Sequence, residues 1–418
     1  MQQKMRLFLL IFFSLYATAH LYAFLKAKAA LEFGWRGGSL LALWMCLMAI
    51  APLLIRMLER QGLGFLARLL AYLGYTWLGI LFLFLCTSLL LDLIRLVLSL
   101  VGLTWNNKSS GLSISSRAAL FLPLLLSAAL AVVGYFEALD IQTEKVVFQS
   151  PKIPKEMGWI KVAQISDVHL GLIVREGRLE RILRPVREFA PDILVSTGDL
   201  MDGQANDLSG IAERLQGMVP RYGKFAVTGN HEYYAGINQS LQFLERAGFS
   251  VLRGTTAEVA GISIAGVDDL AEGYFGPSPH ASESELLSRV PPGRFVLFLK
   301  HRPLVEKSTL GLFDLQLSGH THKGQIFPFS LLAHLYYRLD SGWLNSGGSY
   351  LHVSNGSGTW GPPIRFLAPA EVTLIELGHG ETTRVSISTR GPSYMGRQTN
   401  QGVAAHATHP GFAAVTKS

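Results

Sequence analysis

The stretch WIKVAQISDVH, residues 159–169, begins as a β-strand and ends in an aspartate and a histidine one residue apart. Its first eight residues are mostly apolar or β-branched, which is typical of a strand. Asp167 and His169 follow directly. A lone Asp-x-His is more often a turn with a helix-capping aspartate than a functional site. Recurrence of the same arrangement elsewhere in the chain would favour the functional interpretation.

The arrangement recurs four times. Gly198 and Asp199 follow DILVST, residues 229–232 (GNHE) follow KFAVT, His301 follows RFVLFLK, and residues 319–322 (GHTH) follow LFDLQLS. Between several of these runs lie stretches of helical periodicity, so strands alternate with helices, which predicts an α/β domain with parallel or mixed sheets. Ligands bind at the carboxyl ends of strands in such sheets, so the five loops can converge on one crevice.

Each motif alone has an ordinary structural explanation. Residues 198–199 fit a common βα turn, and a histidine before Arg-Pro, such as His301, is usually hydrogen-bonded within its loop. Residues 229–232 and 319–322 are more specific, because a turn needs glycines but has no use for successive imidazoles and carboxylates. Five ordinary explanations would require unrelated coincidences at the same end of every strand. We therefore favour one shared site.

Taken in order, the five motifs resemble the signature of calcineurin-like metallophosphoesterases, over about residues 159–377. The stretch SNGSGTWGPPIRF, residues 354–366, resembles the C-terminal part of the membrane-associated bacterial branch of that family. Lys323 departs from the branch, which commonly has a second glycine there, and the departure bears on the substrate mouth rather than on the ligands. The resemblance implies a four-layer sandwich of two mixed β-sheets flanked by helices.

The resemblance also implies a centre of two divalent metal ions. Its expected ligands are Asp167, His169 and His322 for the first metal, Asn230, His301 and His320 for the second, and Asp199 as a bridge between them. Imidazole and carboxylate ligands suit Mn, Fe, Zn, Co or Ni better than calcium. Two such ions about 3.5–4 Å apart can activate a shared water and stabilise both oxygens of a phosphoryl transfer.

Two residues of the GNHE motif have open roles. By the resemblance, His231 is catalytic together with Asp199: it protonates the leaving oxygen or stabilises developing charge, and a purely structural role is the alternative. Glu232 either orients His231 or closes the loop. Elsewhere, the run LLAHLYYRL, residues 331–339, is a lid, a core helix or a membrane-interface segment. Arg365 either contacts substrate phosphate or forms an ordinary salt bridge.

Residues 1–139 are a different kind of sequence, which holds nearly all the long uncharged runs of a chain that is 49% hydrophobic. These runs are residues 7–24, 38–55, 70–91 and 118–138. Each approaches the roughly 20 residues that a helix needs to cross a bilayer. The first run, preceded by Lys4 and Arg6, could be a signal peptide, but three more runs follow and no small-residue cleavage site is visible. We predict an all-α transmembrane region.

The net charge of +7 is concentrated in the same region. Through residue 140, eleven Lys and Arg oppose five Asp and Glu, whereas the remainder has 26 against 25. A nucleic-acid-binding domain would carry a basic stripe, and none occurs in the later part, so no nucleic-acid partner is expected. The basic loops set orientation and contact lipid headgroups, and they slightly favour a cytoplasmic catalytic domain. Cys46 and Cys86 both lie in predicted spans, so no disulfide framework is implied.

The predicted order is a transmembrane region at residues 1–139, a juxtamembrane linker at 140–158, a catalytic domain at 159–390 and a disordered tail at 391–418. Pro151 and Pro154 exclude helix from the linker, and the tail is small, polar and aperiodic. The expected protein is a dinuclear-metal phosphohydrolase anchored in a bacterial cell membrane. A phosphate ester is the expected substrate class, and analogy extends it to lipid-linked phosphates or pyrophosphates. The sequence leaves the oligomeric state open.

Two other functional classes compete with this hypothesis. One is a membrane transporter or sensor that uses a phosphoesterase-like domain only to bind a ligand. Transporter spans usually contain ionisable residues in their interior, whereas Asp92, Arg95 and Glu137 lie near the ends of the predicted spans. The other is an inactive scaffold, which would have lost some ligand residues, and here all seven positions are filled.

Overall fold

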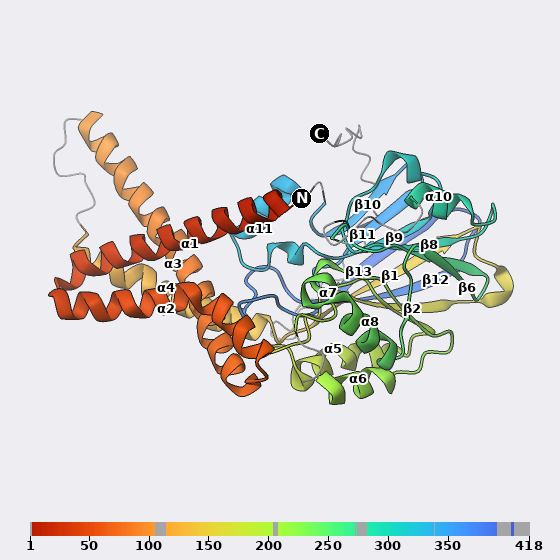
Figure 1. Ribbon diagram of the computed structural model, residues 1–418. Coiled ribbons are helices and arrows are strands. Elements are labelled where there is room, and N and C mark those ends of the chain that lie inside the picture. Colours follow the sequence, from red (N-terminus) through yellow and green to blue (C-terminus); the bar gives the residue numbers. More distant parts are fainter. Residues whose placement is uncertain are drawn as a thin grey trace. The chain divides into compact units, whose positions relative to one another are not determined.

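The computed structural model describes residues 2–104, 114–203, 208–271, 273, 282–337, 339–390 and 403–404. The chain forms two compact units (Figure 1). The first consists of Met1–Phe136 and Gly361–Phe366, and the second consists of Glu137–Trp360 and Leu367–Ser418. Each unit is described by itself.

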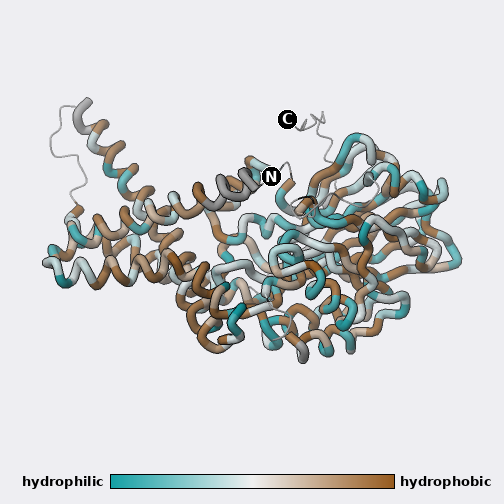
Figure 2. Tube along the Cα trace, viewed as in Figure 1, coloured by the Kyte–Doolittle hydropathy of each residue, from teal (hydrophilic) through white to brown (hydrophobic). Residues whose placement is uncertain are grey.

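The first unit contains four long helices: α1 (Gln2–Leu31), α2 (Trp35–Arg60), α3 (Gly64–Thr104) and α4 (Ser116–Glu137). Each includes a segment that is long and apolar enough to cross a membrane: Leu10–Leu31, Trp35–Arg60, Gly64–Val101 and Ser116–Glu137. Figure 2 shows the apolar residues along them. The predicted all-α region is confirmed, although the helices extend past the uncharged runs, and Asp92 and Arg95 lie within the candidate span Gly64–Val101 instead of near its end.

Besides the apolar packing of its helices, the first unit contains two specific contacts between distant segments. Asp92 on α3 accepts hydrogen bonds from Lys26 at 2.9 Å and from Tyr22 at 2.7 Å, which ties α3 to α1. The segment Gly361–Phe366 packs against α4, where the Arg365 amide donates to the Gly134 carbonyl at 2.9 Å. The Arg365 side chain is fully buried. Arg365 is therefore a packed part of the helical unit, at the point where the chain leaves the second unit and returns to it.

The second unit contains two sheets. The eight-stranded sheet has the order β14-β13-β1-β12-β2-β3-β4-β5. Its strands are β1 (Gln142–Ser150), β2 (Ile160–Ile165), β3 (Ile193–Ser196), β4 (Lys224–Ala226), β5 (Ser250–Val251), β12 (Glu371–His379), β13 (Arg384–Arg390) and β14 (Val403–Ala404). Strands β2 to β5 run parallel, as do β1 and β12, whereas β12 pairs antiparallel with β2 and β1 with β13. The sheet is therefore mixed.

The six-stranded sheet has the order β10-β11-β9-β8-β7-β6. Its strands are β6 (Thr255–Val259), β7 (Ile262–Gly266), β8 (Val296–Leu299), β9 (Leu315–Ser318), β10 (Gly342–Ser346) and β11 (Ser349–Val353). The four central strands, β11, β9, β8 and β7, run parallel to one another. The edge strands β10 and β6 each pair antiparallel with their neighbour. Both sheets contribute fully buried apolar residues to one shared core, among them Phe148, Val195 and Leu297.

Helices cover the outer faces of the two sheets. The α5 helix (Glu176–Phe189) packs on β2 and β12, and α8 (Ile237–Arg246) packs on β5 and on α6 (Ser209–Gln216). On the other side, α10 (Glu283–Ser288) buries Leu286 and Leu287 against the six-stranded sheet. The remaining short elements are η1 (Lys155–Met157), α7 (Asn230–Ala235), η3 (Lys307–Thr309), η4 (His322–Gly324) and α11 (Phe329–Tyr336). The predicted four-layer sandwich is confirmed.

The predicted linker at residues 140–158 is wrong. Strand β1 occupies most of it and lies between β12 and β13, well inside the eight-stranded sheet. Its inward side chains are Glu144, Val146, Phe148 and Ser150. The two polar members of that set hide the apolar alternation that identifies a strand. The predicted tail at 391–418 lies outside the described residues except for Val403–Ala404, which pairs with β13.

Candidate metal centre

The seven expected ligands follow five parallel strands of the two sheets. Asp167 and His169 come after β2, Asp199 after β3, Asn230 after β4, His301 after β8, and His320 and His322 after β9. Strands β2, β3 and β4 are neighbours in one sheet, and β8 and β9 are neighbours in the other. The carboxyl ends of parallel strands meet at the same sheet edge, which brings these loops together.

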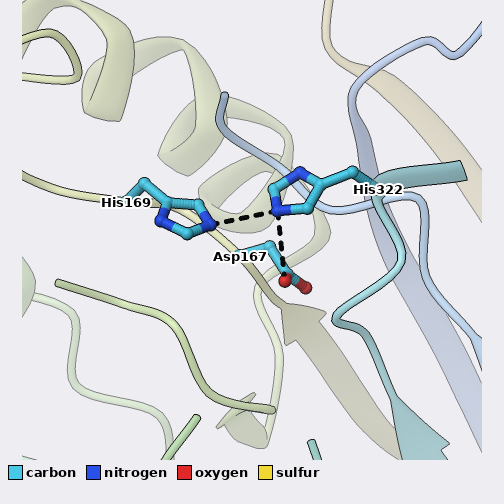
Figure 3. Close-up of side chains that lie close together, drawn as sticks. All are labelled: Asp167, His169 and His322. Atoms are coloured by element: carbon cyan, nitrogen blue, oxygen red, sulfur yellow. Dashed lines mark hydrogen bonds and ion pairs between the residues drawn. The ribbon is translucent and has the colours of Figure 1, made fainter. Parts of the chain in front are cut away.

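The first group contains Asp167, His169 and His322. Figure 3 shows the two imidazoles facing each other beside the Asp167 carboxylate. The Nε2 atoms of His169 and His322 are 3.0 Å apart, and His322 Nε2 lies 3.4 Å from Asp167 Oδ1. All three side chains are buried, so the lone-pair atoms converge in an interior where bulk water does not separate them.

The second group contains Asp199, His301 and His320. His301 Nε2 lies 3.0 Å from His320 Nδ1 and 3.3 Å from Asp199 Oδ2. Asp199 also belongs to a group with His169, whose Nε2 lies 3.8 Å from Asp199 Oδ2. The same carboxylate therefore lies within reach of both clusters, as a bridging ligand must.

These separations fit metal coordination. Two atoms that each lie about 2.1 Å from one ion are about 3.0–3.4 Å apart in octahedral or tetrahedral geometry. The four shortest separations within the two groups fall in that range. In addition, Asn230 is buried and its Oδ1 has no hydrogen-bond partner among the described residues. A buried amide oxygen without a donor is costly, and ligation of a cation would satisfy it. The residues present therefore fit a divalent metal centre.

A further contact fixes the tautomer of His301. Its Nδ1 lies 2.8 Å from the Thr197 carbonyl oxygen, which can only accept a hydrogen bond. Nδ1 therefore carries a proton, and Nε2 directs its lone pair toward Asp199 and His320 whenever the ring is neutral. Hydrogen bonds of this kind orient imidazole ligands in metal sites.

The backbone is strained where it carries the candidate ligands. Five of them have φ between 49° and 74°: Asp167, His169, Asp199, His320 and His322. This left-handed region costs a non-glycine residue about 1–2 kcal/mol. Main-chain hydrogen bonds hold two of these turns in place, because the Asp167 amide donates to Gly198 and the His169 amide donates to Asp199, both at 3.0 Å. Such strain is concentrated at functional sites.

Gly319 allows two of the loops to approach closely. A Cβ atom at this position would lie 2.0 Å from Ser166 Oγ and 2.1 Å from Asp167 Oδ2. No side chain can occupy that space. The following amide, of His320, donates to both Asp167 oxygens at 3.0 Å. The glycine of the GHTH motif therefore places one histidine next to an aspartate that lies 153 residues earlier in the chain.

Lys323 also has a left-handed backbone, with φ 51°. This conformation explains why the related branch commonly has glycine at the position. His322, directly before the lysine, still lies in the first group. The departure changes the side chain beside the site and not the arrangement of the ligands.

His231 lies beside the first group but is held by a different partner. It forms a group with His169 and Asp199, and its Nδ1 lies 2.6 Å from Asp202 Oδ1. The Asp202 carboxylate can only accept, so Nδ1 is the nitrogen that carries the proton in the neutral ring. The His231 ring also contacts Tyr234 and Trp360, with ring centroids 5.4 and 5.8 Å away.

Glu232 closes the loops. Its Oε2 accepts the amides of Asp199 at 3.0 Å and Gly229 at 2.7 Å, and its Oε1 accepts those of Leu200 at 2.8 Å and Met201 at 3.1 Å. The side chain is fully buried. Of the two roles left open by the sequence, the structure favours loop closure.

The electrostatics of the centre reflect burial and close charges. Burial lowers the pKa of His169 to about 4, so the ring is neutral at physiological pH, the form that binds a metal. Burial raises the pKa of Asp167 to about 6. At His301 burial acts to lower the pKa, but the charges of Asp199 and Asp167 outweigh it and raise the pKa to about 10. A metal would therefore displace a proton from His301.

Comparison with known proteins identifies the domain. The family model for calcineurin-like phosphoesterases matches residues 160–324. A metallophosphoesterase of Aquifex aeolicus is 41% identical over 258 residues, which are 61% of this chain and 98% of that protein. The chain belongs to the calcineurin-like phosphoesterase family. Membership in this family supports a phosphoesterase hydrolase activity, and the His/Asp groups support divalent-metal binding.

Two other relatives add information. One aligns with a larger share of this chain, and the other is described as a transmembrane protein. A metallophosphoesterase of Campylobacter jejuni is 32% identical over 320 residues, 73% of this chain and 83% of that protein. A transmembrane protein with a metallophosphoesterase domain from Danio rerio is 34% identical over 272 residues, 61% of this chain and 62% of that protein. Together with the four apolar helices, the second similarity supports membrane association of this calcineurin-like phosphoesterase.

Sequence reasoning missed Asp202. It lies three residues after Asp199 in the run GDLMDG, and a second aspartate so close to a βα turn gives no periodic signal. Its partner, His231, is 29 residues away, so only the fold shows the pairing. Asp269 accepts hydrogen bonds from its own loop at Ala271 and from Arg302, beside His301.

Proposed function

We propose that this protein is a membrane-anchored phosphohydrolase that uses two divalent metal ions to cleave a phosphoester or pyrophosphate bond of a lipid-linked substrate. The observation that carries the proposal is the arrangement of two His/Asp groups around the shared carboxylate of Asp199. The metals would be Mn, Fe, Zn, Co or Ni, as the imidazole and carboxylate ligands imply. One metal would be held by Asp167, His169 and His322, and the other by Asn230, His301 and His320. Both would be bound by Asp199.

Bound metals would lower the pKa of a shared water and stabilise the charge that develops on the phosphoryl oxygens. The chain itself supplies the proton. The His231 ring lies in a group with His169 and Asp199, and Asp202 holds its Nδ1, so Nε2 can donate to the leaving oxygen and recover the proton from water. Tyr234 and Trp360 flank the ring and limit its rotation. Glu232 holds the amides of the Asp199 loop in place without taking part in the proton transfer.

The surface beside the centre supports a lipid-linked substrate. The α11 helix starts five residues after η4, the element that begins with His322. It exposes a row of apolar side chains: Phe329, Leu331, Leu332, Leu335 and Tyr336. At its end the Tyr337 ring packs against His320, with centroids 5.8 Å apart. An apolar surface that adjoins a phosphate site suits a substrate with a phosphate head and a hydrocarbon chain.

The test is an activity assay on the full-length protein in detergent. A fragment that begins after residue 150 would lack β1 and so would lose an inner strand of the sheet. With Mn²⁺ added, we expect phosphate release from a membrane-lipid extract and slower cleavage of chromogenic mono- and diesters. Asp199→Ala should abolish both. Equal activity in the parent and Asp199→Ala would contradict the proposal, and tight ligand binding without turnover would favour the transporter or sensor.

We further propose that the catalytic domain lies on the cytoplasmic side of a bacterial cell membrane. The excess of Lys and Arg in the loops beside the apolar helices supports this orientation. A C-terminal fusion to a reporter that is active on one side only tests it directly. Activity of a periplasm-specific reporter would reverse the assignment.

A further inference from the structure

A second cluster of ionisable side chains lies between the two sheets, apart from the residues of the metal centre. It consists of Glu144 on β1, His352 on β11 and Glu371 at the start of β12. His352 is fully buried, and Glu144 is 7% exposed. His352 Nε2 lies 2.9 Å from Glu144 Oε2 and 3.8 Å from Glu371 Oε1. The proposed reaction assigns no role to these residues.

Gln164 on β2 fixes the protonation of the buried imidazole. Its amide nitrogen donates to the Ser318 carbonyl at 3.1 Å and to Thr197 Oγ1 at 2.9 Å. A carbonyl can only accept, so this end of the side chain is the NH₂ group and the opposite end is the oxygen. That oxygen lies 2.9 Å from His352 Nδ1, which must therefore carry a proton. In a neutral ring, Nε2 then has a lone pair.

The lone pair of His352 Nε2 faces two carboxylates. Glu144 Oε2 lies 2.9 Å from Nε2 as an ion-pair contact, yet Nε2 has no hydrogen-bond partner among the described residues. Two carboxylates and an unpartnered nitrogen in a buried place repel one another unless a positive charge lies between them.

We propose that Glu144, His352 and Glu371 form a third site, for one divalent cation, separate from the centre around Asp199. The donor atoms lie within 4.8 Å of one another, close enough to share one ion after small side-chain movements. One imidazole and two carboxylates suit Zn²⁺, Mn²⁺, Fe²⁺ or Co²⁺, and two glutamates balance the charge of such an ion. The Glu371 side chain is 12% exposed, so one of the three proposed ligands is accessible to solvent.

The surrounding residues match the support that metal ligands usually have. Gln164 accepts from the non-ligating nitrogen of His352, the Trp343 indole N–H donates to Glu144 Oε2 at 3.0 Å, and the Thr373 hydroxyl donates to Glu371 Oε1 at 3.2 Å. Each ligand is thus oriented by a neighbour. The three ligands come from both sheets, so a bound ion would join the two layers of the sandwich.

The site would also support the catalytic loops. The groups that fix Gln164 are Thr197, two residues before Asp199, and Ser318, two residues before His320. A cation at His352 would lock the orientation of Gln164 and, through it, the ends of β3 and β9. The expected role is structural: the ion would raise stability and preserve the geometry of the first centre without contacting the substrate.

Metal counting tests the proposal. The full-length protein is loaded with Zn²⁺, desalted and measured by elemental analysis beside two variants. Glu144→Gln/Glu371→Gln should bind one equivalent fewer than the parent, and Glu376→Gln, a matched change on the same strand β12, should bind the same as the parent. Equal zinc in the parent and the double variant overturns the proposal and identifies the cluster as an ionic network without a metal.

A second measurement does not depend on the folding of the double variant. In an Asp199→Ala/His320→Ala background, which disables the first centre and leaves the cluster intact, one zinc equivalent should still bind and should raise the melting temperature. Circular dichroism verifies that the background is folded. No bound zinc in that folded background overturns the third site and leaves the proposed hydrolase function untouched, because activity is not part of the readout.

Discussion

Removal of the Glu232 carboxylate should destabilise the second unit far more than an ordinary glutamate change. Four amides donate to it, those of Asp199, Leu200, Met201 and Gly229. A buried N–H without an acceptor costs about 1–3 kcal/mol, so Glu232→Ala should cost at least about 4 kcal/mol. For a domain of this size, 1 kcal/mol corresponds to about 2–4 °C, and the melting temperature should fall by about 8–16 °C.

The assay is thermal unfolding of the full-length protein in detergent, without added metal, so that lost metal binding does not contribute. Glu232→Gln keeps the side-chain volume but turns an NH₂ group toward two of the amide donors. Its melting temperature should therefore fall by roughly half as much as that of Glu232→Ala. Glu245→Ala, an exposed change on α8, is the control and should stay within about 0.5 kcal/mol of the parent. A fall of under 2 °C for Glu232→Ala would refute the assignment of loop closure.

Three further changes have defined outcomes. His231→Gln should lower kcat by about 10²–10⁴-fold at unchanged metal content, and loss of metal in this variant would contradict the non-ligand role. Asp202→Asn should move the alkaline limb of the pH–rate profile to lower pH, because it removes a charge that stabilises the protonated His231 ring. Leu335→Asp, on the exposed face of α11, should slow cleavage of a lipid-linked substrate several-fold and leave the rate of cleavage of a soluble chromogenic ester unchanged. Equal slowing of both reactions would count against α11 as the lipid contact. Burial lowers the pKa of Lys224 to about 8, below its value in the unfolded chain. Above pH 8 the unfolded state therefore binds more protons than the folded state, and the contribution of Lys224 to stability rises with pH. The melting temperature of the parent minus that of Lys224→Met should increase from pH 7.5 to 9.5, and a constant difference would refute this pH dependence.

The parts of the fold that the sequence predicted well are those with strong local signals. The runs before Asp167, Asp199 and His301 are short and apolar, and each forms a buried strand within two residues of the predicted position. The helical region follows from uncharged runs whose length matches a bilayer. The candidate ligands are found because each directly follows such a strand, so the local pattern and the site coincide.

The parts that the sequence did not reveal depend on distant partners. The Glu144 side chain of β1 points into the domain, where it meets His352, 208 residues later in the chain. Without knowledge of that partner, a glutamate in the middle of a run argues against a buried strand. Asp202 and Glu232 have their roles because of contacts about 30 residues away. For Arg365 the sequence left substrate contact and an ordinary salt bridge open, and the structure shows that its segment packs against α4. Long-range pairing decides each case, and periodicity does not encode it.

The most direct test of the central claim is anomalous diffraction from crystals soaked in Mn²⁺, recorded on both sides of the manganese absorption edge. We expect two peaks about 3.5–4 Å apart with the Asp199 carboxylate between them. One would lie among Asp167, His169 and His322, and the other among Asn230, His301 and His320. A single peak, or none within bonding distance of Asp199, would contradict the dinuclear centre.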